Sequence, residues 1–141
     1  MKNTEQIWLD SQCSIAIEYL KQKGLLVDNI SVCDNKHLIP LFSIWKFNLI
    51  DNSQWWVVAG DLPVDHANGD VAFCSREAVH HFSLKWQLQA ENFLKANIEE
   101  QDRLAHELNA KAKTLFQIFN DESLWLTKKN KYYLNASLLN G

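Results

Sequence analysis

The feature that most limits the fold of this chain is a long stretch, residues 75–120, that contains neither glycine nor proline. As a single helix it would extend about 69 Å, whereas a compact domain of this length has a radius of gyration of about 14 Å. The helix must therefore break, or else project from the domain and pack on a partner. Apolar residues recur in the stretch at helical intervals of three and four, at Val79, Phe82, Trp86, Ala90, Phe93, Leu104, Leu108, Ala112, Leu115 and Phe119.

A break is best placed at Asn97, which can cap the start of a new helix. Glu99, Glu100 and Asp102 suit an acidic first turn after it, and Glu100 has the spacing of a capping-box partner. Ser75 is a suitable N-cap for the helix that precedes the break. We therefore expect two helices that form a hairpin, with one continuous helix in a dimer as the alternative.

The first half of the chain predicts one helix and a small antiparallel sheet. Residues 4–23 have the pattern of an amphipathic helix, which Asn3 can cap and Gly24 can end. Residues 41–50 and 54–59 are rich in β-branched and aromatic side chains on either side of a short polar turn, which is typical of a hairpin. Further short strands are expected at residues 25–33 and at Val71 with Phe73.

These elements predict an α+β fold, in which a small antiparallel sheet of three or four strands packs against the N-terminal helix and the long C-terminal helices. Trp125 is expected to dock on the core of this fold. No linker or change of composition divides the chain, so residues 1–141 are expected to form a single domain. The last few residues are expected to be frayed.

Composition excludes several classes of function. Lys and Arg number 14 against 17 Asp and Glu, and the net charge of −3 argues against general nucleic-acid binding. No apolar run is long enough to span a membrane and no signal peptide is visible, so a cytoplasmic protein is expected. Cys13, Cys33 and Cys74 have no Cys-x-x-Cys spacing, which predicts neither a disulfide framework nor a cysteine zinc site.

The motifs of common enzymes are missing from the sequence. His106-Glu107 resembles the start of a metalloprotease helix, but that motif needs a second histidine where this chain has Ala110. The sequence contains no glycine-rich phosphate loop and no Gly-x-Ser-x-Gly elbow. We therefore expect no cofactor and assign no catalytic residue.

The best candidates for a site lie on the predicted hairpin and just after it. Trp55 and Trp56 are neighbours on a strand and point to opposite faces, so one can pack under the helices while the other lines a surface. The loop after them carries carboxylates and an imidazole that could hold a divalent metal, although aspartates also serve as turn formers. The candidate site residues are Trp55, Trp56, Asp61, Asp65, His66 and His81.

Two segments carry a more specific pattern. They are Trp55-Trp56-Val57-Val58-Ala59-Gly60-Asp61-Leu62-Pro63-Val64-Asp65 and Arg76-Glu77-Ala78-Val79-His80-His81-Phe82-Ser83-Leu84-Lys85-Trp86-Gln87. Together with Trp8 and Trp125, they resemble a family of small bacterial proteins classed as a domain of unknown function. The resemblance implies a small, single-domain cytoplasmic protein, and it supplies no activity or ligand. His66 stands where the pattern has an aromatic residue, so the resemblance implies no family-wide role for it.

The excess of aromatic residues and the lack of catalytic motifs favour a non-enzymatic binding protein. Its contact surface would be the Trp-rich hairpin and the acidic loop at residues 60–74, and its partner a protein or a small molecule. A homodimer through the long C-terminal helices is left open. The alternative is a small metal- or water-dependent hydrolase-like enzyme that uses Asp61, Asp65, His66 and His81.

Overall fold

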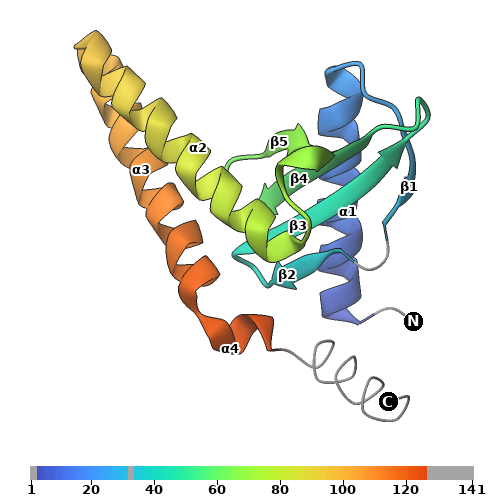
Figure 1. The fold of residues 1–141 in the computed structure, drawn as a ribbon. Helices are drawn as coiled ribbons and strands as arrows, with labels where there is room; N and C mark the ends of the chain where they lie inside the picture. Colours follow the sequence, from blue (N-terminus) through green and yellow to red (C-terminus); the bar gives the residue numbers. More distant parts are fainter. Residues whose placement is uncertain (1–2, 32–33, 127–141) are drawn as a thin grey trace.

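A computed structural model describes residues 3–31 and 34–126 and confirms the α+β class (Figure 1). Its helices are α1 (Thr4–Gln22), α2 (Ser75–Ala96), α3 (Glu99–Asn120) and the short α4 (Glu122–Trp125), with one 3-10 turn, η1 (Gly69–Val71). Its strands are β1 (Val27–Ile30), β2 (Lys36–Leu38), β3 (Phe42–Leu49), β4 (Gln54–Gly60) and β5 (Asp65–Asn68). Within the described residues the antiparallel sheet thus has five strands, one more than the upper limit expected from the sequence.

The sheet is built around the predicted β3–β4 hairpin. The two strands pair in continuous register from Phe42 opposite Gly60 to Asn48 opposite Gln54. β1 and β2 both pair with β3 on its other side, and β5 pairs with β4, so β1 and β5 are the outer strands. At the expected turn, Asn52 adopts a left-handed conformation (φ 71°), which asparagine tolerates well.

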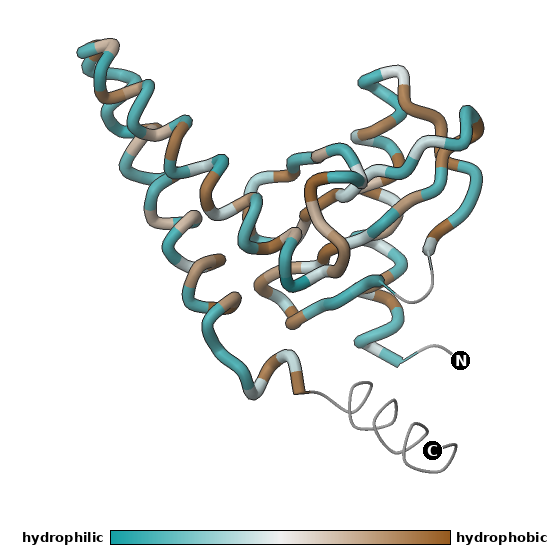
Figure 2. Tube along the Cα trace, in the orientation of Figure 1, coloured by the Kyte–Doolittle hydropathy of each residue, from teal (hydrophilic) through white to brown (hydrophobic). Residues whose placement is uncertain are grey.

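Helices cover both faces of the sheet. The α1 face buries Trp45, Phe47 and Val57 against Ala16 and Leu20. The opposite face packs under the hairpin of α2 and α3, as Figure 1 shows. In Figure 2 the apolar positions concentrate in the central strands and recur along both helices of that hairpin. The core on the α2–α3 side includes Phe42, Ile44, Trp56, Val58, Phe82, Trp86 and Leu115.

The long stretch forms two helices, as predicted, but the residues at their ends have other roles than expected. Asn97 ends α2 in a left-handed conformation (φ 56°) and donates its N–H to the Leu94 carbonyl, while Ile98 is the N-cap of α3. Asparagine suits a left-handed C-cap as well as an N-cap, so the sequence did not separate the two roles. The N-cap of α2 is Cys74 and not Ser75, and it makes no side-chain cap hydrogen bond. The Glu77 carboxylate accepts the N–H of Phe73, just before the helix, at 2.8 Å.

The strand expected at Val71 and Phe73 is wrong. The outer strand β5 lies earlier, and the chain then turns through η1, where Asn68 Oδ1 accepts the N–H of Asp70 at 2.9 Å. Val71 lies in η1, Phe73 belongs to none of the five strands, and both side chains are exposed. The short β2 was not predicted either. Both β2 and β5 are defined by backbone pairing with a central strand and not by their own sequences.

Other local predictions are confirmed. Asn3 caps α1 by accepting the N–H of Gln6 at 2.8 Å, and Gly24 follows the helix with a positive φ of 80°. Trp125 is buried on the core and donates its indole N–H to the Ile118 carbonyl at 2.9 Å. The expected fraying of the last residues lies outside the described ranges. Among the described helices none is both long and apolar enough to cross a membrane.

Candidate functional site

The two tryptophans of the predicted site lie on opposite faces of β4, as expected. Trp56 is fully buried beneath α2, and its indole N–H is shared between the carbonyls of Gly69 and Ala72, each at 3.3 Å. Trp55 is partly buried on the α1 face, with its ring centroid 5.5 Å from that of His66. A partner at the surface would therefore touch Trp55 and not Trp56.

Asp65 and His66 form a network that ties three elements together. The Asp65 carboxylate, on β5, accepts hydrogen bonds from Lys85 Nζ and from Trp86 Nε1 of α2, both at 2.9 Å. His66 Nδ1 pairs with the Tyr19 hydroxyl of α1 at 2.8 Å, and Lys85 Nζ also donates to the His66 carbonyl at 3.0 Å. Because β5 is an outer strand, the hydrogen bond from Lys85 to the His66 carbonyl also shields part of its exposed edge.

The two histidines and the tyrosine in and beside this network are held in their neutral forms. Burial lowers the pKa of His66, against the opposing attraction of Asp65, and Lys85 lowers that pKa further. Burial likewise lowers the pKa of His81, whose ring packs edge-on against Phe82 at 5.7 Å. The pKa of Tyr19 is raised by burial and by the nearby Asp65 charge. The Tyr19–His66 contact is therefore a hydrogen bond between neutral groups at pH 7.

Asp61 does not join the other predicted residues. Its side chain is exposed at the end of β4, and its backbone N–H donates to the Leu41 carbonyl at 3.0 Å. Over residues 3–31 and 34–126, no group of three or more His, Cys, Asp or Glu side chains is arranged to hold a metal ion. Of the six predicted residues, the structure brings together Trp55, Asp65 and His66, with His81 nearby.

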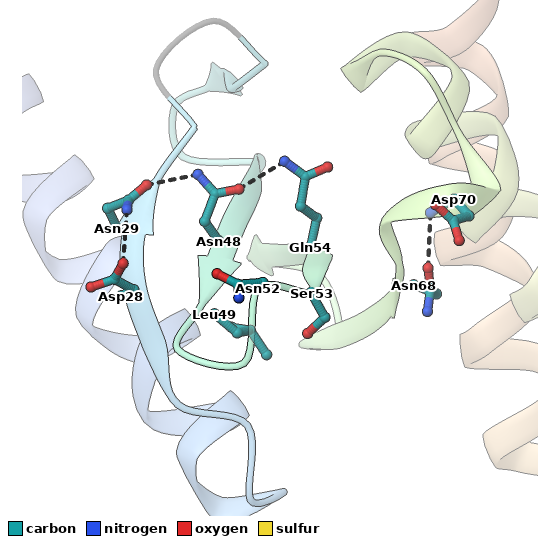
Figure 3. A pocket seen from close by; sticks show the side chains of 9 residues that line it. All are labelled: Asp28, Asn29, Asn48, Leu49, Asn52, Ser53, Gln54, Asn68 and Asp70. Atoms are coloured by element: carbon teal, nitrogen blue, oxygen red, sulfur yellow. Dashed lines mark hydrogen bonds between the residues drawn. The ribbon is translucent and has the colours of Figure 1, made fainter.

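A hollow lies next to the predicted elements, but other side chains line it (Figure 3). It sits at the turn of the β3–β4 hairpin, between β1 on one side and the β5–η1 segment on the other, and its volume is about 470 Å³. We call it the amide concavity, because five of its nine lining residues are asparagine or glutamine. The lining consists of Asp28, Asn29, Asn48, Leu49, Asn52, Ser53, Gln54, Asn68 and Asp70.

The floor of the amide concavity is a ladder of three side chains from neighbouring strands. Asn48 on β3 donates its amide to Asn29 Oδ1 on β1 at 2.7 Å, and its own Oδ1 accepts the Gln54 amide from β4 at 2.8 Å (Figure 3). The three residues are opposite one another in the strand registers. Each amide keeps donor or acceptor capacity beyond these two bonds, so the ladder offers both kinds of group to a ligand.

The polar floor exists because the helix hairpin covers only part of its face of the sheet. Phe42 and Ile44 lie under α2 and α3, whereas Lys46 and Asn48, on the same face of β3, lie beyond the apolar core. The Lys46 ammonium sits 5.2 Å from the centre of the Trp56 ring and marks the boundary. The positions that would be apolar in a fully covered strand are therefore polar here.

The predicted contact surface, the hairpin and the loop after it, supplies only part of this lining, and none of the six predicted site residues belongs to it. The predicted site residues are aromatic or titratable, whereas the lining is mostly amides. One signal was present: Asn48 and Gln54 are polar positions facing the same side as buried apolar residues of the same strands. Recognising their neighbour Asn29 required the pairing of β1, which shifts register between Val27 and Asn29.

Comparison with known proteins gives a family and no activity. None of the curated proteins and none of the solved structures compared with the chain matches it. A family model described as Domain of unknown function (DUF4826) matches residues 2–125, which confirms the resemblance to such a family. The match extends from the start of α1 to the end of α4 and so includes every element described above. The chain therefore belongs to the family described as Domain of unknown function (DUF4826).

Proposed function

We propose that the chain is a non-enzymatic, cytoplasmic binding protein that takes a polar ligand in the amide concavity. The observation that carries this proposal is the ladder of Asn29, Asn48 and Gln54 on the floor of a hollow of about 470 Å³. That volume lies within the range of roughly 300–1,000 Å³ that is usual for ligand sites. The contact surface still includes the hairpin and the loop after it, as the sequence predicts, but its binding groups are amide side chains and not the predicted aromatic ones.

The lining limits the charge of the ligand. Asp28 and Asp70 lie on opposite sides of the hollow in Figure 3, and the described lining contains no Lys, Arg or His. An anionic ligand would meet two carboxylates without a compensating cation. The site therefore favours a neutral or positively charged ligand that carries several hydrogen-bond donors, such as hydroxyl, amide, ammonium or guanidinium groups.

The hydrolase-like alternative has no observation in its favour among the described residues. The Asp61 side chain is exposed to solvent, and both oxygens of Asp65 already accept hydrogen bonds from α2. His66 and His81 are partly buried, and His66 is hydrogen-bonded to Tyr19. These contacts explain Asp65 and His66 as anchors between β5 and the helices.

Titration followed by NMR tests the proposal. Argininamide serves as a cationic probe, N-acetylglucosamine as a neutral probe and glutamate as an anionic one. We expect the side-chain amide signals of Asn48 and Gln54 to shift with at least one of the first two probes and not with glutamate. Absence of any shift with both, or an equal shift with glutamate, would count against the proposal.

A matched pair of variants separates binding at the ladder from a general change of the protein. Asn48→Leu removes the central amide of the ladder, whereas Asn92→Leu makes the same change at an exposed position of α2. We expect the first variant to lose the probe-induced shifts of the remaining lining residues and the second to keep them. Far-UV circular dichroism checks that both variants are folded.

A further inference from the structure

The hairpin of α2 and α3 extends beyond the sheet (Figure 1). Its overhanging part carries an apolar groove. The residues of α2 that face the core, Val79, Phe82 and Trp86, are followed at the same helical spacing by Phe93, which lies past the core. On α3 the buried Leu115 is continued in the same way by Leu108 and Leu104. The groove has a volume of about 310 Å³ and is lined by Pro63, Phe93, Leu104, Glu107, Leu108 and Lys111.

The groove is the uncovered end of the face that the sheet covers elsewhere. Pro63 marks where the sheet stops, because it lies in the loop after β4. Leu104 beyond it is 52% exposed, although its counterpart Leu115 is fully buried. A helix pair with one open apolar face is usually completed by further helices, as in a four-helix bundle.

We propose that a second copy of this chain covers the groove, with its α3 packed antiparallel against α3 of the first. The charges along the helix support this occupant. The first turn of α3 is acidic, with Glu99, Glu100 and Asp102, whereas Lys111 lies three turns further on, in the groove. An antiparallel copy places the acidic end of each helix against the basic part of the other, as two-fold symmetry requires.

The apolar residues and the charges agree on one register. A two-fold axis beside residue 106 puts Leu104 of each copy opposite Leu108 of the other. In that register Glu100 lies within one residue of the position opposite the partner copy's Lys111, on the same face of the helix. The Leu104–Leu108 contact and the Glu100–Lys111 ion pair therefore each form twice in the dimer.

Sedimentation equilibrium of the full chain tests the proposal. We expect a species of twice the 16.4 kDa chain mass, with dissociation in the micromolar range because the interface is small. Leu104→Glu should raise the dissociation constant at least about 100-fold, since each dimer loses two leucine contacts. Leu88→Glu is the matched control, because Leu88 is 59% exposed but lies outside the groove.

Charge exchange tests the register itself. Glu100→Lys alone and Lys111→Glu alone should each raise the dissociation constant about three- to tenfold, and the double variant E100K/K111E should return to within about twofold of the native value. A monomer at all concentrations up to several hundred micromolar would overturn the proposal, because the groove would then be open or covered by another segment or another protein. A dimer that Leu104→Glu leaves unchanged would overturn it equally.

Discussion

Replacement of Asp65 should detach α2 from the edge of the sheet at a cost that follows from its contacts. In Asp65→Ala, the indole N–H of the buried Trp86 loses its acceptor, which costs about 1–3 kcal/mol. The Lys85 ammonium loses its ion pair, but the side chain is 31% exposed and can regain water, so we count about 1 kcal/mol for it. The free energy of unfolding should fall by about 3 kcal/mol in total.

Urea unfolding followed by circular dichroism measures this loss, and two further variants grade it. Asp65→Asn keeps one carbonyl oxygen that can accept from Trp86, so we expect about half of the loss. Asp61→Ala removes an exposed carboxylate from the connection that precedes β5 and should change the free energy of unfolding by less than about 0.5 kcal/mol. If Asp65→Ala costs less than about 1 kcal/mol, the network does not anchor α2.

Three further predictions concern pH, backbone conformation and the helix hairpin. Folding lowers the pKa of His66 and His81, so the free energy of unfolding should have its full value above the ordinary histidine pKa of about 6.5 and should decline as the pH falls through the lowered values. Urea midpoints between pH 8 and 5 measure this decline, which should be shallower in H66Q/H81Q. Gly60→Ala should cost at least about 3 kcal/mol, because φ is 128° and the new Cβ would lie 2.6 Å from the Leu41 carbonyl oxygen. Gly24→Ala, with φ at 80° and open space around it, should cost only about 1–2 kcal/mol in the same urea assay. Ser83→Ala removes a buried 3.0 Å hydrogen bond from α2 to the Ala112 carbonyl of α3 and should cost about 1 kcal/mol, whereas no change in urea midpoint would show that this bond adds nothing.

The parts of the fold that the sequence predicts are those with local causes. Asn3 caps α1 through a residue three positions away, and Gly24 supplies the positive φ that ends the helix. The β3–β4 hairpin is likewise encoded in neighbouring residues, by β-branched and aromatic side chains around a short polar turn. In each case the interacting groups are close in sequence, so the pattern can be read without the tertiary structure.

The parts that the sequence does not predict depend on distant partners. β5 has the sequence Asp65-His66-Ala67-Asn68, which has little intrinsic preference for a strand, and it exists because its backbone pairs with β4 and Lys85 holds its edge. The amide concavity depends on tertiary structure in the same way. Asn29 and Asn48 are far apart in the chain and become neighbours only through a strand register with an irregularity.

A single geometric mismatch explains why this face of the sheet has two unusual surfaces. The α2–α3 hairpin packs on the apolar part of the face, near Phe42 and Val58, and passes beyond the Gly60 end of β4. It therefore overhangs one end of the strands, where it exposes the groove, and leaves the Gln54 end uncovered, where the polar floor forms. The two surfaces lie at opposite ends of β4, so a second copy seated on the groove would leave the amide concavity open. Ligand binding and self-association can therefore occur together, and a result that refutes one of them does not bear on the other.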